Sequence, residues 1–328
     1  MIRKHNLMKA ILYHEYGSPN VLQLKEVEKP TPGNDELLIK VHAVSVNRSD
    51  WEGLIGKPLY ARMGGLRKPG NPILGSDVAG HVEMVGKNNR EFQPGDEVFG
   101  EMEGYHSGFA EYVCTRGKAW ALKPVSMTFE QASAIPQAGV IALQGIRDKG
   151  QLQPGQKVLI NGAGGGAGTF AIQLAKLYGA EVTGVDNTGK LDFMRSLGTD
   201  HVIDYTQENF TRNGKQYDFI LDLIAYRSAF AYARALKPNG SYYAVGGSVV
   251  TFLQFLLFGP WIRRTSGKKV RLLVVQRNRK DLESVAELCE AGKIVPAIDR
   301  RYPLSEVPEA LRYLGENQAK GKVVITVE

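Results

Sequence analysis

Hydrophobic and polar positions divide the chain into two kinds of region. Up to about residue 125, short alternating runs such as 36–46 and 78–85 are separated by turns rich in Pro, Gly and Asn, a pattern typical of half-buried strands. From Phe129 onward, helical patterns alternate with short apolar runs. Many short strands predict a barrel-like domain, and alternating strands and helices predict a doubly wound parallel sheet. We therefore expect an α/β protein.

The last apolar run of the chain sets the expected domain boundaries. Residues 322–327 follow the helical region and read as one more strand, which we expect to return to the N-terminal barrel. The barrel domain would then be discontinuous, over residues 1–127 and 277–328. Residues 128–276 would form the parallel-sheet domain.

The segment 157–186 contains the most informative pattern in the chain. A buried-strand run is followed by five glycines between Gly162 and Gly168, by apolar residues at helical spacing, and by a second strand ending at Asp186. Strand, glycine turn, helix, strand and acid make up the βαβ unit that binds dinucleotides. The alternative, a purely structural glycine loop, does not account for this whole context.

The physical chemistry of the turn indicates which residues would contact the cofactor. Glycines let the backbone approach a pyrophosphate, and the following helix directs free N–H groups at it. The expected contacts in the turn are Gly162, Gly165, Gly166, Ala167 and Gly168. Ligands of such sheets bind at the carboxyl ends of the strands. The residues expected there are Asp186, Asn187, Lys190, Tyr205, Leu223, Ile224, Gly246 and Gly247.

A polar stretch at 47–52 is the first candidate for substrate chemistry. Ser49 and Glu52 have the spacing of a capping box, which predicts a short helix beginning at Ser49. Asn47 precedes that cap, and its amide can both donate and accept hydrogen bonds. It could hold a substrate carbonyl or a nicotinamide ribose, or it could simply satisfy loop backbone.

Composition and charge narrow the class of protein. The chain has 328 residues, of which 43% are hydrophobic and 23% charged, with a net charge of +7, as in an ordinary globular protein. The basic residues form only short clusters, which favours solubility and attraction of anionic cofactors over nucleic-acid binding. Two cysteines exclude a disulfide framework. Residues 1–7 lack the apolar core of a signal peptide, so we expect a cytoplasmic protein.

The apolar stretch 249–262 permits three interpretations. It is too short to span a bilayer and is interrupted by Gly259 and Pro260, so no stable membrane insertion is expected. The favoured interpretation is a helix buried in the core or in a subunit interface. The others are an apolar wall of the substrate site and contact with a membrane surface, which the nearby Arg263 and Arg264 would assist.

Several motifs together resemble the medium-chain dehydrogenase/reductase superfamily over nearly the whole chain. They resemble most its zinc-independent quinone oxidoreductase branch, which includes the reticulon-4-interacting-protein-like reductases. The segments that carry the resemblance are 17–19, 46–51, 72–80, 95–100, 162–168, 198–205 and 321–324. It implies a GroES-like catalytic domain, a Rossmann domain, an NAD(P)H cofactor and a homodimer, and it adds Lys322 to the expected cofactor contacts.

The same resemblance argues against a metal. Zinc-using relatives have a Cys where this chain has Asn47 and a Gly-His-Glu sequence where it has 75–77, Gly-Ser-Asp. Catalytic zinc needs three Cys, His or carboxylate ligands, so no zinc is expected. Without a Lewis acid, a quinone or an activated alkene (an enone) is the expected hydride acceptor. Asn47 and Tyr60 are the candidate catalytic residues, as donors to the acceptor oxygen. An alcohol dehydrogenase of the same fold and a non-catalytic NAD(P)H-binding protein are the alternatives.

The choice between NADPH and NADH rests on conflicting signals. The charge of Asp186 would repel a 2′-phosphate and favours NADH. Lys190 follows closely, and relatives in the branch combine a basic residue here with a Tyr at the position of Tyr205 and mostly use NADPH. We expect NADPH, with NADH as the alternative.

Overall fold

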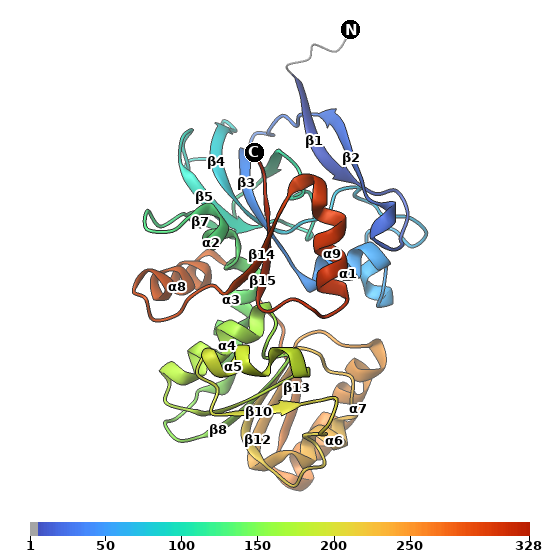
Figure 1. Cartoon of the computed structure of the whole chain (residues 1–328), viewed down its shortest axis with the longest axis vertical. Helices are drawn as coiled ribbons and strands as arrows, with labels where there is room; N and C mark the ends of the chain where they lie inside the picture. The colour runs from blue at the N-terminus through green and yellow to red at the C-terminus, as the bar shows by residue number, and fades with distance from the viewer. Residues whose placement is uncertain (1–5) are drawn as a thin grey trace. The chain divides into compact units, whose positions relative to one another are not determined.

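The computed structural model describes residues 6–328, so most of the segment 1–7 lies outside it. The chain divides into two units (Figure 1). Unit 1 comprises the chain up to Gln137 together with Arg277–Glu290 and Ile298–Glu328, and unit 2 comprises Ala138–Gln276 and Ala291–Ala297. The first boundary thus follows residue 137 rather than 127, and a short segment after residue 290 joins unit 2.

Unit 1 is built on a seven-stranded sheet with the strand order β14-β15-β3-β4-β5-β7, and β6 pairs with β3. A separate antiparallel pair, β1 with β2, completes its strands. The strands are β1 (Leu7–Leu12), β2 (Gln23–Glu28), β3 (Leu37–Val46), β4 (Asp77–Val85), β5 (Glu97–Glu101), β6 (Tyr112–Thr115), β7 (Trp120–Leu122), β14 (Ile298–Pro303) and β15 (Lys322–Thr326). The α-helices are α1 (Arg48–Ile55), α2 (Phe129–Ser133), α8 (Arg279–Glu290) and α9 (Val307–Gly315), and α3 (Pro136–Leu143) begins at the boundary with unit 2.

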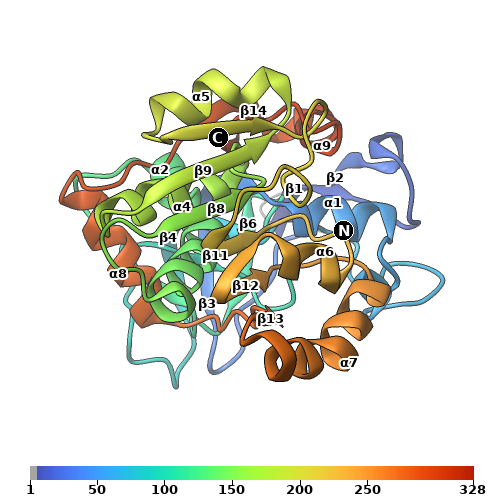
Figure 2. The same ribbon diagram turned by 90° about the horizontal axis from the view of Figure 1, so that it is seen from below.

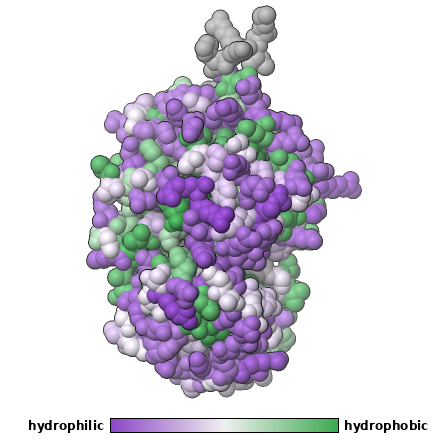
Figure 3. All heavy atoms as spheres, viewed as in Figure 1, coloured by the Kyte–Doolittle hydropathy of each residue, from purple (hydrophilic) through white to green (hydrophobic). Residues whose placement is uncertain are grey.

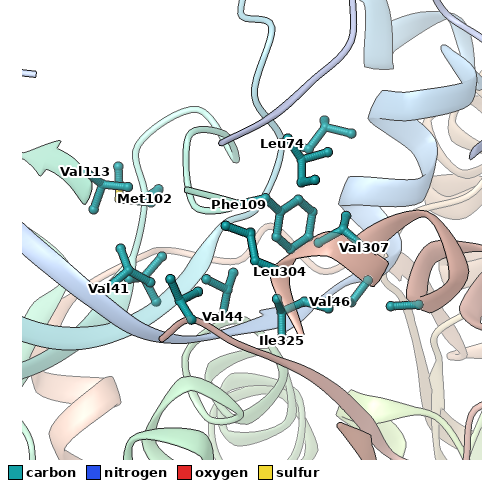
Figure 4. Packing of buried hydrophobic residues seen from close by; sticks show 14 of the residues in the cluster. Val41, Val44, Val46, Leu74, Met102, Phe109, Val113, Leu304, Val307 and Ile325 are labelled. Carbon is teal, nitrogen blue, oxygen red and sulfur yellow. The ribbon is translucent and has the colours of Figure 1, made fainter. Parts of the chain in front are cut away.

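A core of aliphatic and aromatic side chains holds unit 1 together. Phe109 is fully buried and packs with Leu74 and with Leu304 and Val307 from the C-terminal part of the chain (Figure 4). Burying side chains of this size stabilises a fold by about 1.5–3 kcal/mol each. The core therefore ties the end of the chain to its N-terminal half.

The C-terminal strand returns to the N-terminal sheet, as the sequence predicts. β15 pairs antiparallel with β3, with Val323 opposite Val46. This register brings Lys322, at the start of β15, beside the residue that follows β3, Asn47. Two segments at opposite ends of the sequence therefore meet at one place in unit 1.

Unit 2 contains a six-stranded sheet in the order β10-β9-β8-β11-β12-β13, and all its pairings are parallel. The expected doubly wound α/β fold is therefore confirmed. In Figure 2 the strands lie side by side, with α5 at one end of the sheet and α6 and α7 at the other. The elements are β8 (Lys157–Asn161), α4 (Gly166–Leu177), β9 (Glu181–Asp186), α5 (Leu191–Ser196), β10 (His201–Asp204), β11 (Tyr217–Asp222), α6 (Ala229–Arg234), β12 (Leu236–Ala244), α7 (Val249–Ser266) and β13 (Lys269–Leu272).

Helix α7 decides one half of its favoured interpretation, burial in the core or in a subunit interface. Only one face of it is buried, formed by Thr251, Phe255, Gly259 and Ile262. Most of the other apolar side chains of the helix are exposed, so it is not a helix buried in the core. The period of a uniformly apolar stretch cannot show which face packs inward, so the sequence could not exclude burial in the core. Burial in a subunit interface stays a prediction. Across residues 6–328, no helix has both the length and the apolar character needed to cross a bilayer.

Candidate active site

The glycine turn of unit 2 has the geometry that a pyrophosphate needs. Gly162 follows β8 with φ of +82°, a conformation that favours glycine. Gly165 is the N-cap of α4, so the N–H groups of Gly166, Ala167 and Gly168 lie in the first turn, where no preceding helical carbonyl can accept them. A helix N-terminus preceded by a glycine turn is suited to binding an anion.

Strand register brings the other expected cofactor residues to the same edge of the sheet. Asp222 at the end of β11 pairs with Asn161 on β8 and with Ala244 on β12. The loops that follow β8, β11 and β12 therefore all begin at the carboxyl edge of the sheet. Ile224 lies against the turn, because a Cβ on Gly162 would come within 3.1 Å of its Cγ1 atom.

Asp186 and Lys190, which the sequence sets against each other, are partners in the structure. The Lys190 ammonium lies 3.4 Å from Asp186 Oδ1, and both side chains are buried. The other oxygen, Asp186 Oδ2, accepts a hydrogen bond of 3.0 Å from the Gly164 N–H. Lys190 also packs on the turn, since a Cβ on Gly164 would lie 2.8 Å from its Cδ. The acid thus holds both the turn and the base.

Two further expected residues adjoin this pair. Asn187 donates its backbone N–H to Asp186 Oδ1 at 2.9 Å. Tyr205 donates its backbone N–H to the Asp186 carbonyl at 3.1 Å and leaves its ring partly exposed.

Gly246 and Gly247, two further residues expected at the cofactor site, follow β12 with φ of +74° and +122°. All these residues belong to the carboxyl-end loops of the sheet.

Asp222 is a site residue that the sequence analysis missed. Its Oδ1 accepts hydrogen bonds from the Asn161 amide at 2.8 Å and from the backbone N–H groups of Ile224 and Ala225 at 2.9 and 2.8 Å. The Tyr242 hydroxyl donates to its Oδ2 at 2.8 Å. This fully buried carboxylate fixes the loop after β11. The only signal in the sequence was an acid at the end of an apolar run.

In unit 1, Asn47 is the N-cap of a helix, a role that the sequence pattern gave to Ser49. Helix α1 begins at Arg48 with Asn47 as its N-cap, so the predicted start at Ser49 is wrong. The Asp50 carboxylate accepts the Asn47 backbone N–H at 2.7 Å. Asn47 and Asp50 have the same three-residue spacing as Ser49 and Glu52. Both pairs fit a capping box, so the sequence allowed two helix starts that differ by two residues.

The Asn47 side chain joins a buried polar cluster. Its Nδ2 donates to Ser76 Oγ at 3.1 Å, and its Oδ1 accepts from the Lys322 ammonium at 2.5 Å. The same ammonium lies 3.6 Å from Asp77 Oδ2. Glu101 stands opposite Asp77 in the pairing of β4 with β5. We call Asn47, Asp50, Asp77, Glu101 and Lys322 the Lys322 cluster.

Burial changes the proton affinity of every charged member of this cluster. It raises the pKa of Asp50 to about 7 and that of Glu101 to about 8, and it also raises the pKa of Asp77. It lowers the pKa of the Lys322 ammonium, and this effect outweighs the opposing attraction of Asp77. Protons can therefore be held or released in this cluster near neutral pH.

Tyr60 lies on the short 3₁₀ helix Leu59–Arg62, beyond the C-terminal end of α1. Its hydroxyl donates to Glu52 Oε2 at 3.4 Å. Burial, and then the charge of Glu52, raise the pKa of Tyr60 to about 12. The phenol keeps its proton across the physiological range and can act as a hydrogen-bond donor.

The donor set in unit 1 does not match a metal centre. Across the described part of the chain, no group of three or more His, Cys, Asp or Glu side chains is arranged to hold a metal ion. Where a metal would need anionic or imidazole ligands, Asn47 contributes a neutral amide and Lys322 a positive charge.

Comparisons with known proteins agree with this architecture. Residues 33–145 match the alcohol dehydrogenase GroES-like domain family, and residues 197–325 match the zinc-binding dehydrogenase family. The NADPH-dependent alkenal/one oxidoreductase of Arabidopsis thaliana is 33% identical over 97% of this chain and 79% of its own length. The mitochondrial NAD(P)H oxidoreductase RTN4IP1 of Bos taurus is 32% identical, over 99% and 90%. The solved quinone oxidoreductase of Coxiella burnetii is 29% identical, with a TM-score of 0.87 over 98% of this chain and all of its own.

Proposed function

The chain belongs to the medium-chain dehydrogenase/reductase superfamily, and from this premise we propose that it is an NAD(P)H-dependent oxidoreductase that reduces a quinone or an enone. The observation that carries the proposal is the glycine turn, whose helix N-terminus and neighbouring Asp186–Lys190 pair suit an anionic dinucleotide. The names of the alkenal/one and quinone oxidoreductases to which the chain is similar support the acceptor class.

The residues present fit the cofactor. A Cβ built on Gly165 would have the Gly162 carbonyl oxygen as its nearest neighbour, at 3.4 Å. The space beside Gly165 is therefore open to a phosphate. We propose that the turn 162–168 binds the pyrophosphate and that the loops after β9, β11 and β12 hold the rest of the dinucleotide. When bound, the nicotinamide supplies the hydride.

The role we propose for unit 1 is to stabilise negative charge on the acceptor oxygen. An amide carries two N–H donors, and Asn47 uses its Nδ2 toward Ser76. A second donation from Asn47, or one from the Tyr60 phenol, would stabilise a developing oxyanion. The Lys322 ammonium, 2.5 Å from Asn47 Oδ1, polarises the amide and strengthens its N–H donors.

We further propose that the reaction needs no zinc. The positive charge of Lys322 already lies between Asn47 and Asp77, at 2.5 and 3.6 Å. A divalent cation placed there would be repelled by the ammonium, and no three His, Cys or acidic side chains among residues 6–328 are arranged to hold it. The residues at this place therefore do not fit the metal that the zinc-binding dehydrogenase family name implies.

We propose NADPH as the preferred cofactor. The Asp186 carboxylate is paired with Lys190, and this pairing reduces its repulsion of a 2′-phosphate. Replacing Lys190 with Ala should lower kcat/KM for NADPH by about tenfold and leave that for NADH within about twofold. Lys176→Ala, which removes an ammonium bound to Asp200 on the same unit, is the matched control.

Two further proposals concern the oligomeric state and the cellular location. We propose a homodimer, which sedimentation velocity would test, and a cytoplasmic location, which is supported by the low cysteine content. Fractionation of cells that produce the full chain would test the location. Recovery in an organelle would contradict it.

The activity itself is tested with purified protein, NADPH or NADH, and a panel of quinones, enones and ketones. Oxidation of the nicotinamide by quinones or enones supports the proposal. Reduction of simple ketones alone would favour the alcohol dehydrogenase alternative. Cofactor binding without turnover on any acceptor would favour a non-catalytic role.

A further inference from the structure

An apolar strip lies on the outward face of α7. The strip consists of Val250, Leu253, Leu256, Leu257, Phe258 and Trp261, all exposed. Leu256 and Leu257 are 68% and 70% exposed. On the face shown in Figure 3, apolar residues form patches separated by hydrophilic residues. A continuous strip of this kind marks an interaction surface.

The same part of the chain carries the protein's entire excess of positive charge. Residues 223–276 contain eight Lys and Arg and no Asp or Glu, a formal charge of +8, whereas the whole chain carries +7. Within residues 6–328, the one ion pair made by these eight cations joins Lys237 to Asp218. Arg263 and Arg264 are exposed and directly follow the last aromatic residue of the strip, Trp261.

We propose that α7 is a docking surface for an anionic lipid bilayer, with the helix lying in the headgroup layer. Its apolar strip would enter the boundary of the acyl chains while Trp261 stays at headgroup level. Arg263 and Arg264 would bind the anionic headgroups. The opposite face of α7 stays packed on unit 2, with Phe255 and Ile262 buried, so the helix lies on the bilayer and does not cross it.

Charge favours the bilayer over two other occupants. A second copy docked by two-fold symmetry through α7 would bring two segments of charge +8 together, which is repulsive. A nucleic acid would use the cations but would gain little from exposed leucines. An anionic bilayer uses both features, and the inference does not depend on the reaction catalysed.

The test is co-sedimentation of the full chain with vesicles of phosphatidylcholine alone or with added phosphatidylserine. We expect binding to the phosphatidylserine vesicles that weakens as salt is raised. Leu257→Glu should weaken it more than tenfold. Val125→Glu makes the same charge change at an exposed apolar residue of unit 1 and should leave binding unchanged.

A second pair of variants isolates the charge. Replacing Arg263 and Arg264 with Gln should weaken binding about thirtyfold, since each cation near an anionic surface contributes about fivefold. Replacing the exposed Arg90 and Arg116 of unit 1 with Gln is the matched control and should have much less effect. Unchanged thermal unfolding of each variant would show that the fold is intact.

Three results would overturn the inference. One is equal binding to both kinds of vesicle, or binding to neither. Another is a loss in the control variants as large as that in the α7 variants. The third is a wild-type chain that ignores vesicles and either dimerises through α7, so that Leu257→Glu yields monomers, or binds a short DNA duplex.

Discussion

The glycine turn of unit 2 and the Lys322 cluster of unit 1 are built in opposite ways. The turn is formed by backbone groups of consecutive residues. It can fold this tightly because its glycines have no Cβ to collide with neighbouring atoms. The cluster uses side chains from β4, β5, α1 and β15, and Lys322 and Asn47 are 275 residues apart in the chain. The turn is therefore sensitive to an added Cβ where that atom would meet backbone, as at Gly168, whereas the cluster is sensitive to the loss of a partner side chain.

The largest effect should come from removing the buried cation. Lys322→Met leaves the fully buried Asp77 carboxylate without its counter-charge, so we expect a loss of about 3–5 kcal/mol in the free energy of unfolding. Urea unfolding at neutral pH measures it. Adding Asp77→Asn should recover part of the loss. A single variant as stable as the wild type would show that the pair does not hold the cluster.

In the turn, the matched comparison is between two glycines. A Cβ on Gly168 would lie 2.3 Å from the Gly162 carbonyl oxygen, so Gly168→Ala should cost about 1–3 kcal/mol of stability. Gly165→Ala should cost less than about 0.5 kcal/mol but weaken NADPH binding at least about tenfold. Urea unfolding and fluorescence titration separate the two effects. Equal stability losses would contradict the geometry.

The pH dependence of stability should reveal the buried acids. Asp50, with a pKa raised to about 7 by burial, keeps its proton in the folded state while the unfolded state loses it above about pH 4. The folded state thus binds more protons, and stability should fall as pH rises from about 4 to 7, by at most about 1.4 kcal/mol per pH unit from this group.

The control for that slope is an exposed acid. Asp50→Asn should reduce the slope between about pH 4 and 7, whereas Asp192→Asn, whose side chain is exposed, should leave it unchanged. Urea unfolding repeated at several pH values gives both slopes. Identical slopes in the wild type and Asp50→Asn would mean that this carboxyl titrates normally.

The smallest effect concerns Tyr60. If its phenol donates to the acceptor oxygen, Tyr60→Phe should lower kcat/KM by about tenfold. Tyr178→Phe, at a partly exposed tyrosine of unit 2, is the control. An unchanged kcat/KM would leave Asn47 as the candidate donor.

Local patterns explain what could be predicted. The parallel sheet, the turn 162–168 and Asp186 were visible because the residues that form them are neighbours in sequence. The return of β15 to the first domain was also predictable, because an isolated final strand needs a sheet edge to satisfy its backbone. The residues in the loops after β9, β11 and β12 could also be predicted, because the carboxyl ends of the strands of a parallel sheet lie at one edge.

Non-local packing explains what could not be predicted. Sequence spacing did not show that Lys322 bonds to Asn47, because these residues are 275 positions apart and meet only through the pairing of β15 with β3. The start of α1 was misplaced at Ser49 because two overlapping cap patterns compete over six residues. The exposed face of α7 was invisible because apolar residues surround the whole helix, so no period distinguishes inside from outside.

The central claim is that a buried ammonium, rather than a metal, supplies the positive charge beside Asn47. The most direct measurement takes one chelator-treated preparation and determines both its zinc content by mass spectrometry and its NADPH-dependent reduction of 9,10-phenanthrenequinone. The account predicts undiminished turnover with negligible zinc, and no gain when zinc is added. Turnover that disappears with the chelator and returns only with zinc would contradict it.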